Sequence, residues 1–336
     1  MSRQGGARPS FGVGFWGSLD ARTVLQEVQL AERLGYDAVW IGDSQLLWRE
    51  AYVLLGAAAA LTSRVRLGIS VTNPVTRHPT VTASAALTLQ EASGDRAVLG
   101  VGVGSTAVRT LGQPPVSRAA LARWVELLRA LWRGEAVQVD GAAWRLTFGA
   151  PTRGLPIVVA GRGPKMLQLA GRIGDGAILT GCGRANAMAR GMQESVQTGR
   201  AAAGSPPRPF RTYLSIAAAV HPDRRLALEA VRPQVAVALL MPHWPLSGPA
   251  EQARERLRAS YDYYQHMSRQ PRYAELIPDE IVPRFALAGT PEECVAQLRE
   301  LSALGFDEIT LIPYATEDSS RADMVAALAR DVVQRV

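Results

Sequence analysis

Short runs of apolar and β-branched residues recur along the whole chain, and most are continuous rather than alternating with polar residues. Continuous apolar runs of this length are typical of strands that are covered on both faces, as in a parallel sheet. Eight runs are therefore predicted to be strands: 11–16, 38–43, 66–72, 97–104, 156–161, 176–180, 213–220 and 308–314.

Segments with helical periodicity lie between these runs, and two of them carry clear start and stop signals. The segment from Asp20 to Gly35 begins with a residue that caps helices well and ends with a glycine. In the segment from Thr290 to Gly305, Pro291 occupies the first helical position, where its missing N–H does no harm. Eight alternations of strand and helix predict a (β/α)8 barrel of the TIM type rather than a doubly wound open sheet.

The chain is predicted to form a single barrel domain over residues 1–336, with a flexible tail at 1–10. Residues 105–155 and 241–285 are interpreted as insertions after the fourth and the seventh strand. The first contains a helix at about 117–133 and a hairpin at Asp140-Gly141, and the second is helical, aromatic-rich and bounded by prolines. Barrel enzymes keep their chemistry at the ends of the strands, so both insertions are predicted to be lids or pocket walls. Packing or dimer contacts are the alternative.

Composition and charge narrow the class of protein. No stretch reaches the roughly 18 apolar residues of a membrane helix, and the first ten residues lack a signal-peptide core, so a cytoplasmic protein without a membrane partner is expected. The net charge is +7, but the arginines are scattered and no nucleic-acid-binding motif is present. A basic surface instead suits an anionic small molecule. The two cysteines and four histidines lack metal-site spacing, so no metal site is predicted.

A crowded elbow follows the third predicted strand. The strand stops on Asn73-Pro74, turns through Arg77-His78-Pro79 and restarts as a helix. His78 is an acid–base candidate near neutral pH, although a histidine in such a turn more often satisfies the turn itself. Asp43, at the end of the second strand, and Trp48 are expected to face the barrel mouth. A helix cap at Asp43 and a core position for Trp48 are the alternatives.

Two glycine-rich segments mark strand ends. The segment "GVGVGSTA" at 100–107 lacks the third glycine and the acidic residue of a dinucleotide fingerprint, so its glycines are interpreted as places where a flat ring approaches the backbone. In 158–176 a strand runs into a Gly-Arg-Gly-Pro turn at 161–164, and a helix begins near Lys165, the only lysine of the chain. Free N–H groups at a helix N-terminus bind anions, so this turn is predicted to bind a phosphate.

Together these segments resemble the bacterial luciferase-like superfamily, and within it the F420-dependent reductases similar to methylenetetrahydromethanopterin reductase. The resemblance covers nearly the whole chain. It is carried by "GYDAVWIGDSQLLWREAYVLL", "RLGISVTNPVTRHPTVTASAALTLQEASGDRAVLGVGVG" and "FALAGTPEECVAQLRELSALGFDEI". It implies a TIM-type barrel with insertions, a deazaflavin or flavin at the mouth, a small-molecule substrate and a homodimer.

The resemblance also accounts for the elbow, because the third strand of this family carries a non-prolyl cis peptide that backs the ring system. Here that bond is Ser70–Val71, and Thr72 and Asn73 continue the wall. The positions that the resemblance implies for catalysis are Asp43, Ser44 and Trp48. The positions that it implies for cofactor binding are Ser70, Val71, Thr72, Asn73, Gly104, Ser105, Thr106, Ala160, Gly161, Arg162, Gly163, Pro164 and Lys165.

Two departures from the family pattern bear on the chemistry. Luciferases and the sugar-6-phosphate dehydrogenase branch have a histidine at the position of Ser44, and that branch has a glutamate at the position of Ser105. Hydride transfer to an iminium carbon needs no proton at that carbon, only a donor and an acceptor held close together. The resemblance thus implies an F420-dependent oxidoreductase that transfers a hydride between the deazaflavin C5 and an imine or conjugated C=C or C=N acceptor, with specialised metabolism as one setting.

Two other functions stay open at this point. One is an FMN-dependent monooxygenase that uses O2 and a separate flavin reductase. The other is a non-catalytic flavin-binding or partner-binding relative. Preference for FMN over F420, or binding without turnover, would identify them.

Overall fold

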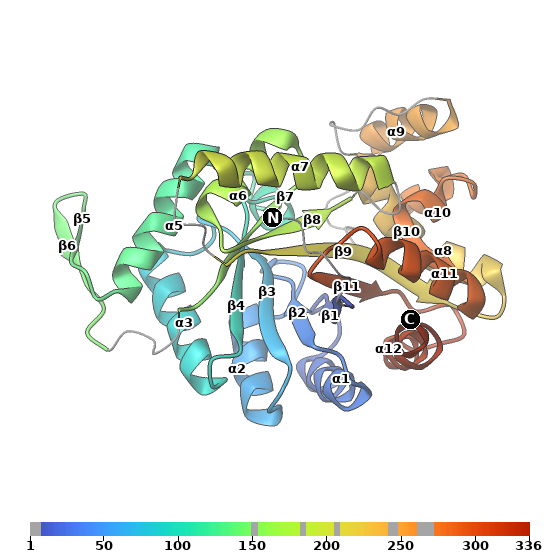
Figure 1. Cartoon of the computed structure of the whole chain (residues 1–336), viewed down its shortest axis with the longest axis horizontal. Helices are drawn as coiled ribbons and strands as arrows, with labels where there is room; N and C mark the ends of the chain where they lie inside the picture. Colours follow the sequence, from blue (N-terminus) through green and yellow to red (C-terminus); the bar gives the residue numbers. More distant parts are fainter. Residues whose placement is uncertain (1–7, 149–153, 182–185, 205–208, 241–247, 261–271) are drawn as a thin grey trace.

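The computed structural model describes residues 8–148, 154–181, 186–204, 209–240, 248–260 and 272–336. Eight parallel strands close into a barrel surrounded by helices (Figure 1). These strands are β1 Ser10–Phe15, β2 Ala38–Ile41, β3 Arg66–Thr72, β4 Ala97–Val101, β7 Ile157–Gly161, β8 Gly176–Thr180, β9 Arg211–Val220 and β11 Glu308–Pro313. Each pairs with the next in this series, and β11 pairs back with β1. The predicted (β/α)8 barrel is confirmed, and the open-sheet alternative is wrong.

The two helices with predicted start and stop signals both begin as predicted; the first ends at Gly35 as predicted, whereas the second ends at Ser302, before Gly305. The α-helices are α1 Ala21–Leu34, α2 Ala51–Leu61, α3 Pro79–Ala92, α4 Thr106–Arg109, α5 Arg118–Trp132, α6 Pro164–Ile173, α7 Asn186–Ala202, α8 Arg224–Leu239, α9 Pro249–Ser260, α10 Val282–Phe285, α11 Pro291–Ser302 and α12 Arg321–Ala327. Asp20 accepts a hydrogen bond from the backbone N–H of Thr23 at 3.1 Å, and Gly35 ends α1 with a φ of 93°. Thr290 and Glu293 form a capping box at the start of α11.

One strand was not predicted. β10, Ala286–Gly289, pairs in parallel with residues 217–220 of β9. β9 is ten residues long, and β8 pairs only with residues 211–215, so the outer half of that edge is left for another strand. The sequence "ALAG" alone looks like a short loop before the helix that Thr290 caps, because the strand it pairs with, β9, lies far away in the chain.

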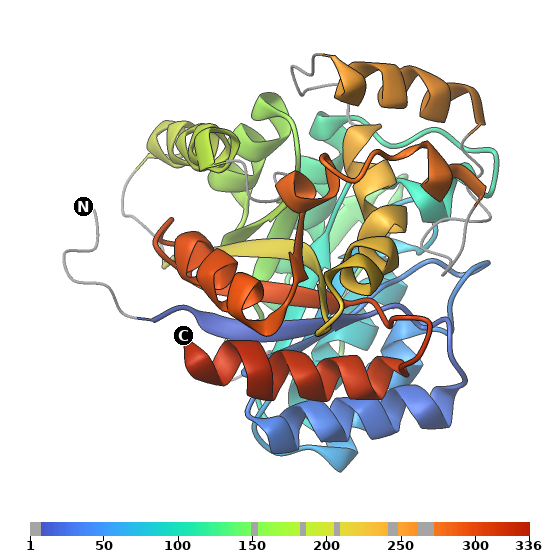
Figure 2. The same ribbon diagram turned by 90° about the vertical axis from the view of Figure 1, so that its right-hand side faces the viewer.

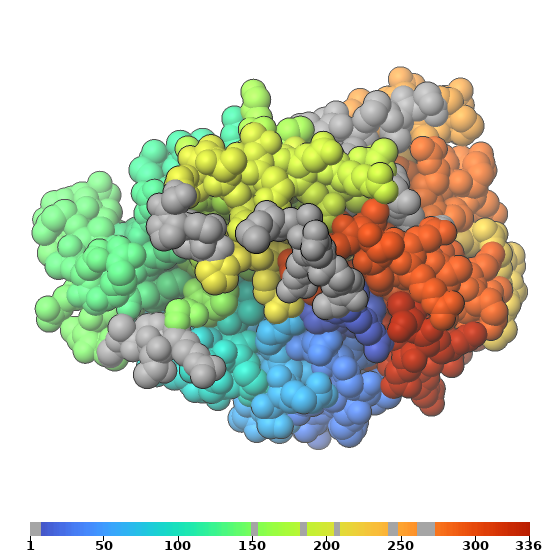
Figure 3. All heavy atoms as spheres, in the orientation of Figure 1, coloured from blue at the N-terminus to red at the C-terminus, as the bar shows by residue number. Residues whose placement is uncertain are grey.

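The first predicted insertion has the expected parts. α5 packs against α3 and α6, so it is the barrel helix that follows β4. The hairpin consists of β5 Val137–Val139 and β6 Ala142–Trp144, with its turn at Asp140 and Gly141, which have φ angles of 48° and 82°. It protrudes beside α5 at the left of the molecule (Figure 3).

The second predicted insertion does not follow its strand directly, because α8 comes first. The described parts of the segment are α9, a 3-10 turn at Arg272–Leu276 and α10, and all three pack on α8. In Figure 2, where β1 points to the right, α9 lies at the upper right, on the side toward which the strands point. Its role as a lid stays a prediction.

The barrel interior is filled at the end where the strands begin. Glu308, the first residue of β11, is fully buried and accepts hydrogen bonds from Trp40 Nε1 at 2.7 Å and from Arg66 at 2.6 Å. The Trp40 ring lies flat against Gly68, where a Cβ would come within 2.2 Å of it. Since this end is plugged, the opposite end is where the barrel can receive a ligand. None of the described helices has the length and apolar character that a membrane span needs.

Candidate active site at the barrel mouth

The predicted site residues gather at the carboxyl ends of four adjacent strands, β2, β3, β4 and β7. The loops after these strands also contact one another. Gln45 donates a hydrogen bond to the carbonyl of Ala107 at 2.8 Å, and the backbone N–H of Gly102 donates to the carbonyl of Thr72 at 2.9 Å. The segments after β2, β3 and β4, which are distant in sequence, therefore lie together at one rim, and β7 ends beside β4.

The predicted cis peptide bond between Ser70 and Val71 lies near the end of β3, just before the elbow. The register between β3 and β4 shifts between Ile69 and Thr72, so the strand bulges there. Gly100 of β4 makes room for the bulge, because a Cβ at this position would lie 2.0 Å from the carbonyl oxygen of Ile69. Gly100, the first glycine of the "GVGVG" segment, is thus required by the backbone of the neighbouring strand β3.

Val71 and Ala160 form part of the floor of the mouth. Both are half-buried and pack against the side chains that fill the barrel interior, which include Trp40 and Tyr213. Val71 also lies over Gly102, where a Cβ would approach its Cγ2 to 3.1 Å. The bulge therefore presents a smooth apolar floor, which suits a flat ring.

Asn73 is used to build the elbow rather than to present a free amide. Its Oδ1 accepts hydrogen bonds from the backbone N–H groups of Val75 and Thr76, both at 3.0 Å, and its Nδ2 donates to the Thr76 hydroxyl at 3.1 Å. These bonds fold the asparagine turn that the sequence predicts before Pro74.

Asp43 faces the elbow. Both of its oxygens accept hydrogen bonds from Arg77, at 3.2 Å from Nε and 3.3 Å from Nη2, and Arg77 also pairs with Glu50. Burial by itself would lower the pKa of Arg77, but its bond to Asp43 and the charges of Asp43 and Glu50 raise the pKa overall. The alternative in which Asp43 caps a helix is wrong, because Glu50 caps α2 by accepting from the Val53 N–H at 2.7 Å.

Trp48 stacks on Trp16 from the end of β1, with ring centroids 4.8 Å apart and an interplanar angle of 21°. Gly42 permits this, since a Cβ there would lie 2.6 Å from Trp16 and 2.8 Å from Trp48. Trp48 is half-exposed at the rim, so the alternative in which it is a core residue is wrong.

At this rim the buried polar atoms Trp16 Nε1, Tyr52 Oη and Thr72 Oγ1 form no hydrogen bond of good geometry, although Tyr52 and Thr72 interact with each other and Trp16 interacts with Tyr314. Only two other such side-chain atoms, Trp124 Nε1 and Arg211 Nε, occur elsewhere among the described residues. Burial raises the pKa of Tyr52, and the charge of Asp43 adds to the rise. Buried polar atoms without a well-formed hydrogen bond are costly, so their concentration here indicates a place for a polar ligand.

Three other predicted site residues at the rim, Ser44, Ser105 and Thr106, have small hydroxyl side chains. Ser44 is buried, and its side chain has no hydrogen-bond partner among the described residues. Ser105 is exposed and precedes α4 without capping it, whereas Thr106 is buried. Gly104 turns the chain with a φ of 93°, and Val108 and Asn73 lie next to it. No acid–base side chain stands at the positions of Ser44 and Ser105.

The predicted phosphate turn lies between β7 and α6. Gly161 ends β7, and the close start of α6 would place Leu167 3.0 Å from a Cβ at this position. Gly163 is the N-cap and Pro164 the first residue of α6, and no side chain caps its first turn. Arg162 donates to the hydroxyl of Thr180 on β8 at 2.8 Å, whereas Lys165 is exposed. Pro164 has no N–H and the Met166 N–H donates to the Gly163 carbonyl at 3.0 Å, so in this turn the backbone N–H of Lys165 is left for an anion.

Sequence reasoning did not identify Arg77, Glu50 and Tyr52 as parts of the site. The position of Arg77, a charged residue between the two prolines of the elbow, was the one feature of the sequence that could have indicated its place in the site. The Arg77 guanidinium also lies 4.5 Å from the centroid of the Tyr52 ring, so these residues form one cluster.

The other candidates are remote from this cluster or outside the described residues. His78 is exposed, bonds to the Thr80 hydroxyl at 2.7 Å and packs on Trp144, in agreement with the local-turn interpretation. His221 pairs with Asp318 at 3.2 Å. Outside the described residues lie Cys182, His243, Trp244, Tyr261, Tyr263, Tyr264 and His266. Within the described ranges, no three His, Cys, Asp or Glu side chains are grouped so that they could hold a metal ion.

The sequence matches the luciferase-like monooxygenase family over residues 4–308. The chain therefore belongs to this family of enzymes, as the resemblance predicted. A relative from Archaeoglobus fulgidus, 5,10-methylenetetrahydromethanopterin reductase, is 31% identical over 89% of this chain and 92% of its own. The F420-dependent glucose-6-phosphate dehydrogenase of Beutenbergia cavernae is 31% identical over 92% of this chain and 90% of its own.

Solved structures agree on the fold. The coenzyme F420 dependent tetrahydromethanopterin reductase of Methanopyrus kandleri aligns with a TM-score of 0.78 over 98% of this chain and 99% of its own, at 22% identity. An F420-dependent secondary alcohol dehydrogenase aligns with a TM-score of 0.78 over 98% of this chain and 100% of its own, at 19% identity.

Proposed function

We propose that the protein is an F420-dependent oxidoreductase that transfers a hydride between the deazaflavin C5 and an imine or conjugated C=C or C=N carbon of a small molecule. The observation that carries the proposal is the rim of β2, β3 and β4, which combines an apolar floor with buried polar atoms that lack well-formed hydrogen bonds but has Ser44 and Ser105 where an acid–base pair would stand. The names of the two curated relatives, one F420-dependent and one a methylene-pterin reductase, support the same chemistry.

The residues present fit such a cofactor. Val71, over Gly100 and Gly102, offers a flat surface, and Thr72 Oγ1 and Tyr52 Oη offer hydrogen bonds to a polar ring edge. The first turn of α6, which follows the next strand around the rim, offers the backbone N–H of Lys165 to a phosphate. Asn73 contributes indirectly, because it fixes the elbow.

When bound, F420 would supply a hydride donor or acceptor at C5. The chain would then hold the acceptor against the ring and exclude water. The stacked rings of Trp16 and Trp48 give the substrate side an apolar wall. Arg77 forms an ion pair with Asp43, so the buried carboxylate leaves no unbalanced negative charge at the rim. The carboxylate can then orient a cationic iminium or a polar substrate group.

The site is a poor source of protons, which favours acceptors that need none from the protein. The raised pKa of Tyr52 makes its phenol a weaker acid than usual. His78 is bonded away from the mouth, and His221 is engaged by Asp318. Iminium carbons therefore rank above conjugated C=C acceptors among the proposed substrates.

The test is equilibrium binding of oxidised F420 and, separately, of FMN to the purified protein by fluorescence titration. We expect a dissociation constant in the micromolar range for F420, about −8 kcal/mol, and binding of FMN at least about tenfold weaker. The reverse preference, with oxygen consumption by reduced FMN, would contradict the proposal and indicate a monooxygenase. Failure to bind either would point to a non-catalytic relative.

We also propose that the protein is a homodimer that associates through α2 and α3. The two helices pack side by side, and their outer surface carries almost no charge. α2 contains no charged residue, and in α3 only Glu91 is charged. Val53 on α2 and Val81 on α3 are 70% and 53% exposed, and a second copy of the chain would cover these apolar side chains.

Replacing both Val53 and Val81 with glutamate should convert the dimer into a monomer, because four carboxylates would have to be buried in one symmetric interface. Light scattering coupled to gel filtration measures the mass. Ala201→Glu on the exposed face of α7, across the barrel, is the matched control and should leave the dimer intact. A wild-type protein that is monomeric at tens of micromolar would disprove the proposed interface.

A further inference from the structure

A second set of contacts continues the rim on the side of β1 and β11, which lies across the barrel from β7 and α6. Trp16 follows β1 and stacks on Trp48. Tyr314 follows β11, and its backbone N–H donates to the carbonyl of Ala218 at 2.9 Å. Its hydroxyl interacts with the indole of Trp16 and donates to Oε1 of Gln234 on α8 at 3.3 Å. Trp48, Trp16, Tyr314 and Gln234 thus form one continuous side of the mouth, which we call the β1–β11 wall.

The hydrogen bonds of this wall run in one direction. Burial raises the pKa of Tyr314, and its interaction with Trp16 opposes that rise, as an N–H that donates to the phenol oxygen would. The indole N–H is only a donor, so the tyrosine proton goes to the other partner, the Oε1 of Gln234. The amide of Gln234 is thereby held with its oxygen toward Tyr314, and its NH2 group is the end that is offered to a ligand.

The NH2 group of Gln234 is accessible. Within the described ranges its Nε2 forms no hydrogen bond, and it is not one of the buried polar atoms that lack a partner, so it keeps accessible surface. The rest of this part of α8 is enclosed, because Pro233 and residues 235–239 are buried. In Figure 2 α8, drawn in gold, lies at the side toward which the strands point. The accessible amide therefore lies beside the β1–β11 wall.

The charged neighbours of the wall are already paired. Arg232, two positions before Gln234 on α8, forms an ion pair with Asp279. Arg321, which follows the end of β11, forms an ion pair with the buried carboxylate of Glu27 at 2.5 Å. The wall therefore offers a neutral hydrogen-bond donor rather than a charge.

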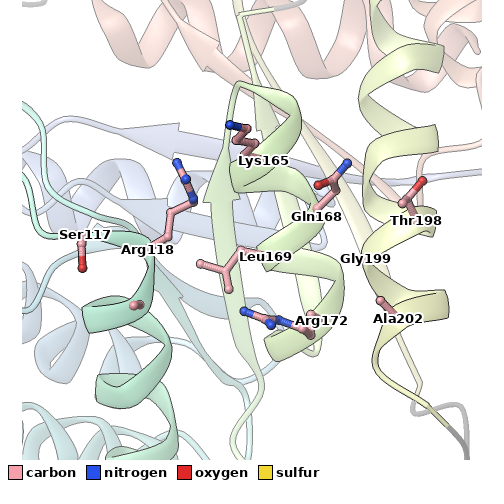
Figure 4. A pocket seen from close by; sticks show the side chains of 10 residues that line it. Ser117, Arg118, Lys165, Gln168, Leu169, Arg172, Thr198, Gly199 and Ala202 are labelled. Carbon is pink, nitrogen blue, oxygen red and sulfur yellow. The ribbon is translucent and has the colours of Figure 1, made fainter.

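The opposite side of the barrel has a different character. There the exposed side chains of Lys165 and Arg118 point toward the same space between α5 and α6 (Figure 4). Positive charges attract the anionic parts of a ligand to that side. This leaves the β1–β11 wall for a neutral group.

We propose that Gln234 determines substrate specificity by donating from Nε2 to a carbonyl oxygen that adjoins the C=N or C=C bond of the acceptor, and that Tyr314 positions its amide. The inference rests on the proposed function and names a substrate class within it, neutral imines and related acceptors that carry a carbonyl group. A carbonyl oxygen only accepts hydrogen bonds, so it matches an NH2 group whose own oxygen is occupied. During reduction the acceptor carbon takes a hydride from reduced F420, which is oxidised, and the neighbouring atom of the double bond takes a proton from water.

The test uses two cyclic imines of the same size. One is a benzoxazinone with a methyl group on its C=N carbon and a ring carbonyl beside that carbon, and the other is the matching benzoxazine, in which CH2 replaces the carbonyl. Calorimetric titration into protein saturated with oxidised F420, which has no hydride to give, measures each dissociation constant without turnover. The wild-type protein should bind the benzoxazinone about fivefold more tightly than the benzoxazine.

Removing the donor should remove the preference. In Gln234→Leu the two imines should bind about equally, because only the benzoxazinone loses a hydrogen bond. Gln193→Leu on α7 is the matched control, since Gln193 is also partly buried but its Nε2 donates to the carbonyl of Leu304, before β11 begins, at 3.0 Å. This control should keep the full preference. Thermal unfolding of each variant checks that the fold is intact.

Two further variants separate the donor from its positioning. In Tyr314→Phe the amide of Gln234 is free to turn, so the preference should fall to about twofold, while kcat for the benzoxazine with reduced F420 should stay the same. Gln234→Glu keeps the size of the side chain but replaces the donor with a carboxylate, which repels a carbonyl oxygen. This variant should bind the benzoxazine more tightly than the benzoxazinone.

Four outcomes would overturn the inference. If wild-type protein bound both imines equally, or bound F420 but neither imine, or if Gln234→Leu kept the preference, Gln234 would not recognise a carbonyl group, although F420 would remain the cofactor. If Gln234→Leu lost both imines alike while it still bound F420, the residue would only shape the wall. Failure of the wild-type protein to bind F420 would instead show that the proposed function is wrong, and the substrate class would be wrong with it.

Discussion

Replacing Gly100 with alanine should destabilise the barrel by roughly 3 kcal/mol and abolish cofactor binding. The added Cβ would lie 2.0 Å from the carbonyl oxygen of Ile69, which is a backbone atom in the middle of β3. Because a strand cannot move this atom without losing its pairing with β4, the whole elbow would have to shift. The midpoint of urea unfolding and the fluorescence titration with F420 measure the two effects.

Two other glycines give a graded comparison. At Gly102 a Cβ would meet only the Cγ2 tip of Val71, at 3.1 Å, so Gly102→Ala should cost about 1 kcal/mol. Gly191 lies in the exposed part of α7 with nothing within 4 Å, so Gly191→Ala should stabilise the protein by about 0.5–1 kcal/mol. If Gly100→Ala unfolded at the same urea concentration as Gly191→Ala, the elbow would be adaptable, and its shape would not define the site.

The backbone of this site was predictable from sequence, because glycine and proline restrict or permit backbone conformations at their own positions, independently of distant parts of the chain. The stop on Asn73-Pro74 predicted an elbow, and Asn73 indeed folds the turn with its own side chain. The Gly-Arg-Gly-Pro turn predicted a helix start, which occurs at Pro164. The same reasoning located the eight barrel strands, whose continuous apolar runs do not depend on knowing their partners.

Contacts between loops were not predictable in this way. Asp43 and Arg77 are separated by 34 positions and meet only because β2 and β3 are neighbours in the closed barrel. The stacking of Trp16 on Trp48 likewise needs β1 beside β2. β10 was not predicted for a related reason, since the four residues Ala286–Gly289 can be identified as a strand only beside the unpaired half of β9.

Replacing Arg77 with methionine should destabilise the protein by about 3–5 kcal/mol, because it leaves the charge of Asp43 buried without a partner. The Asp43 side chain is only 5% exposed, and the two hydrogen bonds from Arg77 satisfy both of its oxygens. Arg77→Lys should recover part of the loss, since an ammonium keeps the charge but not the paired geometry. Urea unfolding of the two variants provides the comparison.

A double-mutant cycle separates the buried pair from a general effect of losing an arginine. Asp43→Leu/Arg77→Met removes both charges and should regain most of the stability while cofactor binding and turnover stay impaired, so the coupling free energy should exceed about 2 kcal/mol. The exposed pair of Arg225 and Glu229 on α8 is the matched control, and Arg225→Met should cost no more than about 0.5 kcal/mol. A cost for Arg77→Met as small as that of Arg225→Met would mean that water reaches Asp43, and that the carboxylate is not held in the site by Arg77.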